Sequence, residues 1–338
     1  MPIDPAERID IIMKPDKNKI LIASGAVLGA TAVFGTAAYL TTKFLMKTAI
    51  DREGPKMMTH ATNRIAGSLI SEEVFKRVAD AAAKLEAAPT ERVEIQGFDD
   101  ITLVGHWYPA QNPKRIVVAM HGWRSSWSSD FGLMADFLHD NDCSVLFAEQ
   151  RGQNNSGGDH MGFGVIERYD CLDWAQWVID NKSKTLPVYL CGVSMGATTV
   201  LMAGGLKLPE SVHGIIADCA FTSPDEIWNH VVNDNLHINY NIHKGLASAI
   251  YERKNQYAES SYSTIDALRQ CKIPVLFIHG TDDHFVPIEM TYRNYLACAS
   301  PKRLLIVPGA DHGMSCFMCL LRWNREIRIK KQRFEIFV

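Results

Sequence analysis

LCGVSMGATTV, residues 190–200, places a serine between two glycines at the point where an apolar run ends. The run before it has the length of a short buried strand, and Ala197, Val200 and Leu201 recur after it at helical spacing. A strand-to-helix turn with the pattern Gly-x-Ser-x-Gly is tight enough to need glycine on both sides, and it exposes the serine hydroxyl. The motif also arises by chance in glycine-rich turns, so other parts of the chain have to decide its meaning.

The composition is that of an ordinary globular protein, with 338 residues, 47% hydrophobic and 22% charged. This length allows one large domain or two small ones. The formal net charge of −3 offers no basic excess to neutralise phosphates, so we expect no nucleic-acid partner. The composition leaves the oligomeric state open.

The eight cysteines all lie at or beyond Cys143, and several stand inside apolar runs. This placement favours small buried hydrophobic residues over a disulfide framework. Cys316 and Cys319 form a Cys-x-x-Cys pair four residues after His312. Without a second pair of ligands a zinc site is not favoured, and we expect neither a metal nor a cofactor.

Residues 20–42 form an uncharged run of 23 residues with lysines on both sides. A helix of this length spans the roughly 30 Å hydrocarbon core of a bilayer, so we expect a tail at 1–19 and a single-pass transmembrane anchor at 20–42. A cleaved signal peptide and a buried core helix are the alternatives. The flanking basic residues balance, so orientation stays open, with an extracytoplasmic catalytic domain as the default expectation.

A juxtamembrane linker with one helix is expected at 43–89, and a β-α alternation follows over 90–338. The expected strands are 91–96, 101–108, 115–120, 143–148, 187–191, 213–218, 273–278 and 303–307. The expected helices between them lie near 130–141, 165–182, 194–206 and 287–298. This order predicts an α/β fold, with a mostly parallel sheet covered by helices on both faces.

An activated serine needs a histidine base and a carboxylate to orient that base. In open parallel sheets such groups gather beyond the carboxyl ends of the strands. His121, His279 and His312 follow strands in this way, and His312, the last in the chain, suits the order serine, acid, histidine. Asp282 and Asp283 follow the penultimate predicted strand and are the leading acids. Asp218 is a minority alternative, and the side chain of Asp311 should point away from His312.

Six segments resemble the α/β-hydrolase superfamily in order and spacing: HGWRSS, QRGQNNSGG, GVSMGA, DCAFTS, IPVLFIHGTDDHFVP and PGADHG. They are most similar to its serine-aminopeptidase and cinnamoyl-esterase-like branch, which includes membrane-anchored bacterial members. The resemblance covers roughly residues 90–315. It implies an α/β-hydrolase fold with a short helical cap, here residues 222–264.

The resemblance also implies roles for individual residues. Matched to the family pattern, Ser194 is the nucleophile, Asp283 the acid and His312 the base. The backbone amides of Met195 and Trp123 then form the oxyanion hole, and His121 and His279 become structural. The resemblance implies a small-molecule or lipid-like acyl substrate and cleavage of carboxylic esters through an acyl-enzyme. A serine peptidase, a thioesterase and a non-catalytic membrane-bound module are the alternatives.

The chain departs from the family pattern in two places. Glu149 replaces the usual aspartate two residues before an Arg-Gly pair, and the basic stretch after Ser315 lacks the usual amphipathic helix. In the cap we expect Trp228, Tyr240, Tyr251 and Tyr257 to line an acyl or aromatic pocket, or half of them to pack the cap instead. The catalytic motifs begin near residue 120, so we expect the chemistry not to need residues 1–46.

Overall fold

The computed structural model describes residues 17–55 and 72–319, with side chains described from Val33 onward. The strands are β1 Glu91–Gln96, β2 Thr102–Tyr108, β3 Arg115–Met120, β4 Cys143–Ala148, β5 Val188–Val193, β6 Val212–Asp218, β7 Val275–Gly280 and β8 Lys302–Val307. The helices are α1 Lys17–Ile50, α3 Glu72–Glu86, α4 Trp127–Asp140, α5 Glu167–Asn181, α6 Met195–Ala203, α7 Pro224–His230, η1 Val231–Asn235, α8 Tyr240–Asn255, α9 Thr264–Gln270 and α10 Ile288–Ala297.

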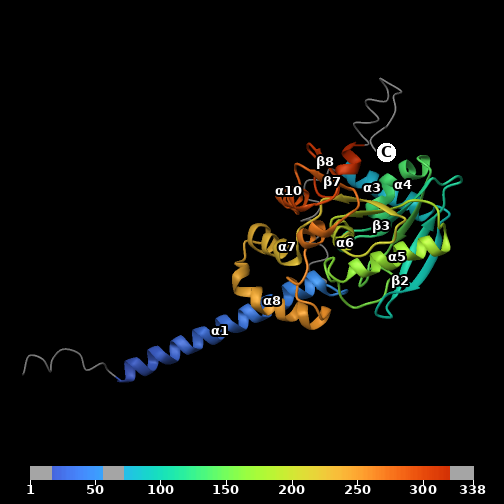
Figure 1. Cartoon of the computed structure of the whole chain (residues 1–338). Helices are drawn as coiled ribbons and strands as arrows, with labels where there is room; N and C mark the ends of the chain where they lie inside the picture. The colour runs from blue at the N-terminus through green and yellow to red at the C-terminus, as the bar shows by residue number, and fades with distance from the viewer. Residues whose placement is uncertain (1–16, 56–71, 320–338) are drawn as a thin grey trace, which may run out of the picture.

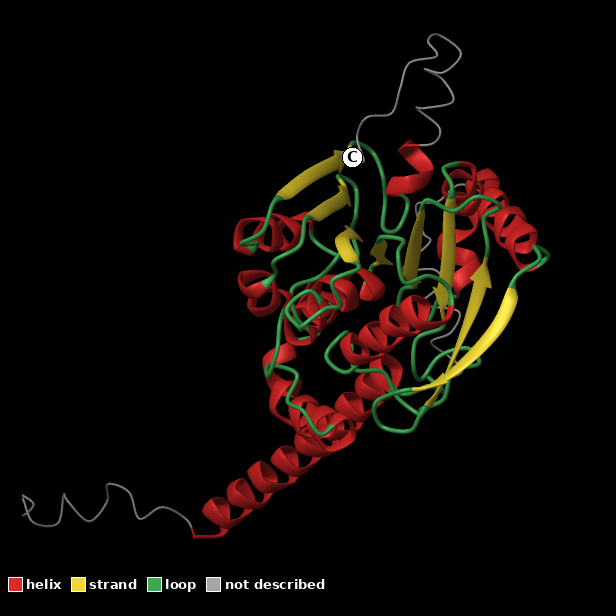
Figure 2. Cartoon of the chain, turned by 45° about the vertical axis from the view of Figure 1, so that its right-hand side comes forward, coloured by secondary structure: helices red, strands yellow, loops and turns green. Residues whose placement is uncertain are grey.

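One eight-stranded sheet carries the fold, in the order β1-β2-β4-β3-β5-β6-β7-β8. The first two strands run antiparallel to their neighbours, and the rest pair in parallel. All eight strands expected from the sequence are present, with ends shifted by no more than two residues. The predicted mostly parallel sheet is therefore confirmed, and Figure 2 shows it between its helices.

Helices cover both faces of the sheet because its central strands are apolar on both sides. Along β3, Ile116 and Val118 face a core shared with α5 and α6. Val117 and Ala119 face the opposite core, which α3 and α4 complete. This alternation follows from the two-residue period of a strand, and it holds the carboxyl ends of β5, β7 and β8 in fixed positions.

The predicted cap segment, 222–264, is largely helical and contains α7, η1 and α8. Figure 1 shows α1 projecting from the body with its C-terminal end against α8. The helix expected in the linker is α3, which packs against α4 at the edge of the domain. The basic stretch 320–338 lies outside the described residues.

The N-terminal helix differs from the expected division into an anchor at 20–42 and a linker from residue 43. It continues to Ile50, and Met46 and Ile50 are buried in the core under the cap. Most of the apolar run lies where side chains are not described. Among the described residues, no helix is long and apolar enough to cross a membrane.

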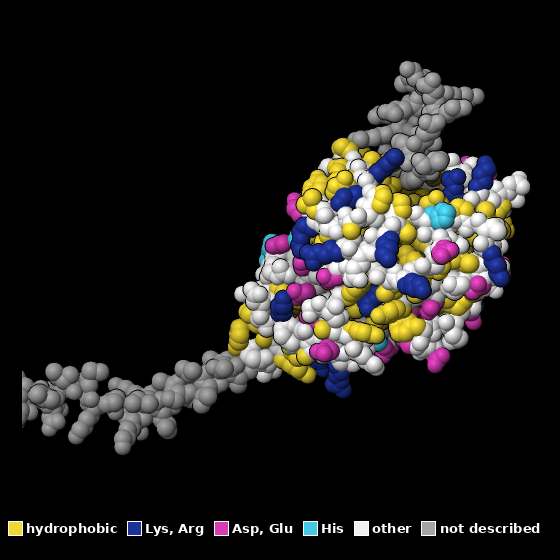
Figure 3. Space-filling model, in the orientation of Figure 1, with side chains coloured by type: hydrophobic (Ala, Val, Ile, Leu, Met, Phe, Trp, Pro, Cys, Tyr) yellow, Lys and Arg dark blue, Asp and Glu magenta, His cyan; other side chains and the backbone are white. Residues whose placement is uncertain are grey.

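Exposed hydrophobic side chains surround the point where α1 leaves the body (Figure 3). They include Val33, Phe34 and Leu40 on α1 and Ile242 on α8. Scattered apolar residues are normal on a protein surface, but these four lie on two helices that pack together.

Candidate active site

Ser194 occupies the sharp turn between β5 and α6. Its φ of 54° and ψ of −118° are strained values for a non-glycine residue. A Cβ at Gly192 would overlap the backbone of Gly196, and one at Gly196 would overlap the carbonyl of Met120. The amide of Ser194 donates to the carbonyl of Asp218 at 2.9 Å. Both glycines of the motif are therefore required, as expected from the tightness of the turn.

The structure brings Ser194 together with His312 and Asp283. The Nε2 atom of His312 lies 2.9 Å from Ser194 Oγ, and its Nδ1 atom lies 2.8 Å from Asp283 Oδ2. Asp283 follows β7 and His312 follows β8, so the three side chains meet beyond the carboxyl ends of parallel strands. This arrangement has the hydrogen bonds of a nucleophile, a base and an orienting acid.

Buried hydrogen bonds keep the Asp283 carboxylate charged. Burial alone would raise its pKa, but the His312 and His279 side chains offset this and hold the pKa below its usual range. The amides of Phe285 and Val286 donate to Asp283 Oδ1 at 2.9 and 2.8 Å. Burial alone would lower the pKa of His312, yet the Asp283 carboxylate raises it well above its usual value.

The loop after β3 passes close beside the serine. A Cβ at Gly122 would lie 3.3 Å from Ser194 Cβ, so only glycine allows this approach without crowding. The amides on either side of Trp123 are held by side chains: Gly122 N donates to Asp130 at 2.6 Å, and Arg124 N donates to Gln153 at 2.5 Å. The loop is thus fixed beside Ser194, and the Met195 amide begins α6.

The two other histidines at strand ends, His121 and His279, have hydrogen-bond partners of their own. His121 is fully buried, its Nδ1 atom lies 2.8 Å from the carbonyl of Gly122, and its Nε2 atom accepts from the amide of Gln150 at 3.1 Å. His279 bonds Thr291 through Nδ1 at 2.6 Å, and its Nε2 atom lies 3.2 Å from Asp283 Oδ2. His279 therefore touches the acid, a contact that sequence reasoning missed.

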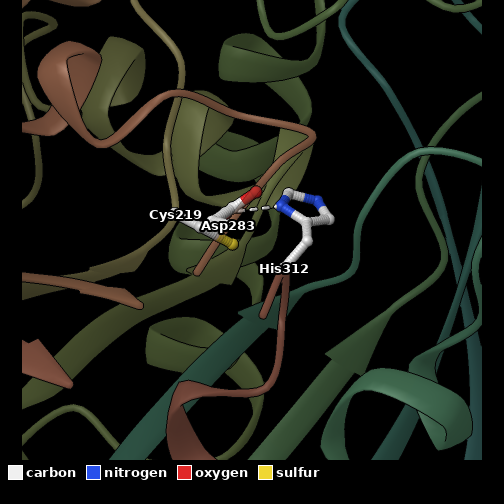
Figure 4. A group of neighbouring side chains, drawn as sticks. All are labelled: Cys219, Asp283 and His312. Atoms are coloured by element: carbon white, nitrogen blue, oxygen red, sulfur yellow. Dashed lines mark hydrogen bonds and ion pairs between the residues drawn. The ribbon is translucent and has the colours of Figure 1, made fainter. Parts of the chain in front are cut away.

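Cys219, directly after β6, is a second residue that sequence reasoning did not place in the site (Figure 4). Its sulfur and the side-chain ligand atoms of Asp283 and His312 lie within 4.8 Å of one another. Three such donors could hold a metal ion, but those of Asp283 and His312 already bond each other. Burial raises the pKa of the Cys219 thiol to about 11, so it stays protonated and is a poor nucleophile.

Asp218, the minority candidate for the acid, lies one strand away. It is buried, and burial raises the pKa of its carboxyl to about 6. The described hydrogen bonds join His312 Nδ1 to Asp283, the acid implied by the family pattern. Asp282 is exposed and accepts a hydrogen bond from the Thr281 hydroxyl, and Asp311 accepts one from the backbone amide of His312. Neither carboxylate makes a described hydrogen bond with the His312 ring.

An apolar cavity of about 100 Å³ opens beside Ser194. Its walls come from α1, from Trp123 in the loop after β3, from the cap and from Phe285. Of the four cap aromatics, Trp228 and Tyr240 line it. Tyr251 is buried within the cap, and its hydroxyl donates to the carbonyl of Gly162 at 2.8 Å. Tyr257 is 37% exposed and does not line the cavity.

Residues 111–264 match the family model described as serine aminopeptidase, S33. The fold matches that of an esterase from Pyrococcus furiosus, Pf2001, with a TM-score of 0.58 and 18% identity over 77% of this chain and 94% of that one. The structural matches show that the chain has the α/β-hydrolase fold. A further structural match is Est1E from Butyrivibrio proteoclasticus, solved with ferulic acid, with a TM-score of 0.54 and 17% identity over 70% of this chain and 97% of that one.

Sequence relatives extend the likeness beyond the sheet. The chain is 26% identical over 299 residues to YqkD of Bacillus subtilis, an uncharacterised protein, and the match covers 88% of this chain and 92% of that one. It is also 26% identical over 230 residues to YfhR of Escherichia coli K12, likewise uncharacterised, over 66% and 73% of the two chains. The expected resemblance is confirmed by the serine aminopeptidase family model over residues 111–264 and by the α/β-hydrolase fold, but no membrane-anchored resemblance is shown.

Proposed function

We propose that this hydrolase is a serine carboxylesterase that works through a Ser194–His312–Asp283 triad and an acyl-enzyme. The observation that carries the proposal is the pair of hydrogen bonds on His312, 2.9 Å to Ser194 Oγ and 2.8 Å to Asp283 Oδ2. A histidine bonded on both sides in this way can accept the serine proton while the carboxylate stabilises its positive charge.

In acylation, Ser194 Oγ attacks the carbonyl carbon of the ester and its proton moves to His312 Nε2. The developing oxyanion is bound by the amides of Met195 and Trp123, as the family resemblance implies. The tetrahedral intermediate then expels the alkoxide, which takes the proton from His312 and leaves as an alcohol. The acyl group remains as an ester on Ser194.

In deacylation, water replaces the alcohol. His312 takes a proton from the water as its oxygen attacks the acyl carbon, and the same two amides hold the oxyanion. Collapse of this intermediate returns the proton from His312 to Ser194 Oγ and releases the carboxylic acid. A serine nucleophile excludes the dehalogenase branch of the superfamily, which uses aspartate.

The cavity favours esters over peptides with a free amino terminus. An aminopeptidase site has to hold the charged ammonium group of its substrate, and a buried ammonium group needs a carboxylate to compensate its charge. None of the described residues that line this cavity is an aspartate or a glutamate. A thioester would be cleaved by the same triad, so it is the second acyl substrate to test.

The proposal is tested with a fluorophosphonate probe, which reacts only with an activated serine. We expect the full chain to be labelled and to hydrolyse short p-nitrophenyl esters. Ser194→Ala should abolish labelling and lower kcat by roughly 10⁶-fold while the protein stays folded, because the nucleophile is lost. Absence of labelling in a folded wild-type protein would favour the non-catalytic alternative.

We also propose that residues 20–42 anchor the protein in a membrane. The support is the uncharged run of 23 residues between lysines. Carbonate extraction of membranes tests it, since an anchored chain stays in the pellet. Recovery of the full-length protein in the supernatant would contradict the anchor, and protease accessibility in intact cells reports the side on which the domain lies.

A further inference from the structure

The last two turns of α1 present one face to the cavity beside Ser194. Thr42, Leu45, Met46 and Ala49 line this cavity, and they recur at the three- and four-residue spacing that places side chains on one face of a helix. Thr42 is 1% exposed and Met46 is 4% exposed, so this face is covered by the rest of the protein.

The loop beside the serine holds the C-terminal end of α1. The indole Nε1 of Trp123 donates to the carbonyl of Ala49 at 2.7 Å. The guanidinium of Arg124 donates to the carbonyl of Thr48 at 2.8 and 3.0 Å and to that of Asp51 at 2.6 Å. These carbonyls lie in the last turn of the helix and just beyond it, where intrahelical partners run out and a positive charge is favourable.

The cap and the loop after β4 attach the same segment on its other sides. The Nδ1 atom of His243, on α8, lies 2.8 Å from Thr42 Oγ1. The Thr42 hydroxyl donates to the carbonyl of Ala38, so His243 supplies the proton of the pair. The amide of Met161 donates to the carbonyl of Ile50 at 2.7 Å. The segment is therefore fixed by polar contacts as well as by its apolar face.

The opposite wall of the cavity is apolar and aromatic. It includes Trp228 and Val232 from the cap, Phe163 from the loop after β4 and Phe285 from the loop after β7. The volume of about 100 Å³ compares with roughly 150 Å³ for an apolar cavity that holds benzene. Such a cavity fits an uncharged hydrocarbon group of about four to eight carbons and disfavours a charged one.

We propose that residues Thr42–Ala49 of α1 form one wall of an acyl-binding pocket, and that Met46 and Ala49 set the length of apolar acyl group that the enzyme accepts. The inference rests on the proposed function, which supplies the ester bond at Ser194. The substrate class is then a carboxylic ester whose acyl group is unbranched or compact and apolar. The N-terminal helix is a specificity-determining element of the enzyme.

The test is a series of p-nitrophenyl esters from acetyl to dodecanoyl, measured as kcat/KM with the full chain. Ala49→Phe should fill the pocket and lower kcat/KM for hexanoyl and longer esters by at least about tenfold, since a single misplaced methylene already costs 10-fold or more. Acetyl ester hydrolysis should change by less than about threefold. Met46→Ala should move the optimum toward longer chains.

Leu40→Ala is the matched control, because Leu40 lies on the same helix but is 59% exposed and outside the cavity. It should keep the wild-type profile, and a thermal melt of each variant shows that it is folded. Folded Ala49→Phe and Met46→Ala variants with the wild-type chain-length profile would overturn the inference.

A binding measurement separates this inference from the proposed function. The Ser194→Ala variant should bind octanoate in calorimetry, and Ala49→Phe in that background should weaken binding at least about tenfold. If no ester is hydrolysed but this difference is seen, the pocket stands and the esterase proposal fails. If esters are hydrolysed but neither the profile nor the binding responds to Ala49→Phe, the pocket inference fails alone.

Discussion

Arg124→Met removes the side chain that holds the end of α1 while keeping a similar stem. Three backbone carbonyls, those of Thr48, Asp51 and Arg52, accept from the guanidinium in the native protein. A hydrogen bond to a charged group contributes about 1.5–3 kcal/mol, and bonds that share one donor do not add fully. We therefore expect the free energy of local opening of α1 to fall by about 3 kcal/mol.

Native-state hydrogen exchange measures this loss directly. A decrease of about 3 kcal/mol corresponds to exchange roughly 100-fold faster, since each 1.4 kcal/mol is a factor of ten. The amides between Thr42 and Asp51 should show it, while those of the central strands should not. Arg92→Met is the control, because Arg92 pairs with Glu94 on the surface. Exchange of α1 within about threefold of the wild type would refute the reasoning.

Three further outcomes follow from the site. Asp283→Asn should lower kcat/KM by about 10³–10⁴-fold, whereas Asp218→Asn should cost less than about tenfold; the reverse order in ester hydrolysis would move the acid to β6. Because Asp283 raises the pKa of His312, and His312 must be neutral to act as a base, kcat/KM should fall with falling pH in a limb above pH 6.5. That limb should shift downward in Asp283→Asn, and a pH–rate profile without the shift would contradict the pairing. Deletion of residues 1–50 should lower kcat/KM for hexanoyl esters more than for acetyl esters, unlike deletion of residues 1–16, which leaves α1 whole; equal profiles for the two truncations would count against a role of α1 in the pocket.

The sheet could be predicted from the sequence because each central strand is a short apolar run with turn residues at both ends. The rule that sites form beyond the carboxyl ends of parallel strands predicts from the sequence alone that Ser194 and His312 lie together. The choice of Asp283 over Asp282 needed the family pattern, since two adjacent residues in a loop have no periodicity to separate them.

The contacts of Cys219 and His279 with Asp283 and His312 could not be predicted, because they depend on how neighbouring strand ends pack. The role of α1 was missed for a different reason. The uncharged run at 20–42 predicts a membrane anchor that ends at residue 42. The face that lines the cavity continues past this point to Ala49. The helical spacing of Thr42, Met46 and Ala49 was present in the sequence, but its partner surface is more than 70 residues away.

The use of α1 as a pocket wall constrains how this chain can diverge. A substitution at Met46 or Ala49 changes both the docking of the helix and the shape that the substrate meets. We therefore expect compensating replacements between α1 and Trp228 or Val232 across the cavity when related sequences are compared. Exchange of the N-terminal segment between homologues should therefore transfer the acyl preference as well. The sequence of this helix and the substrate range of the enzyme should evolve together.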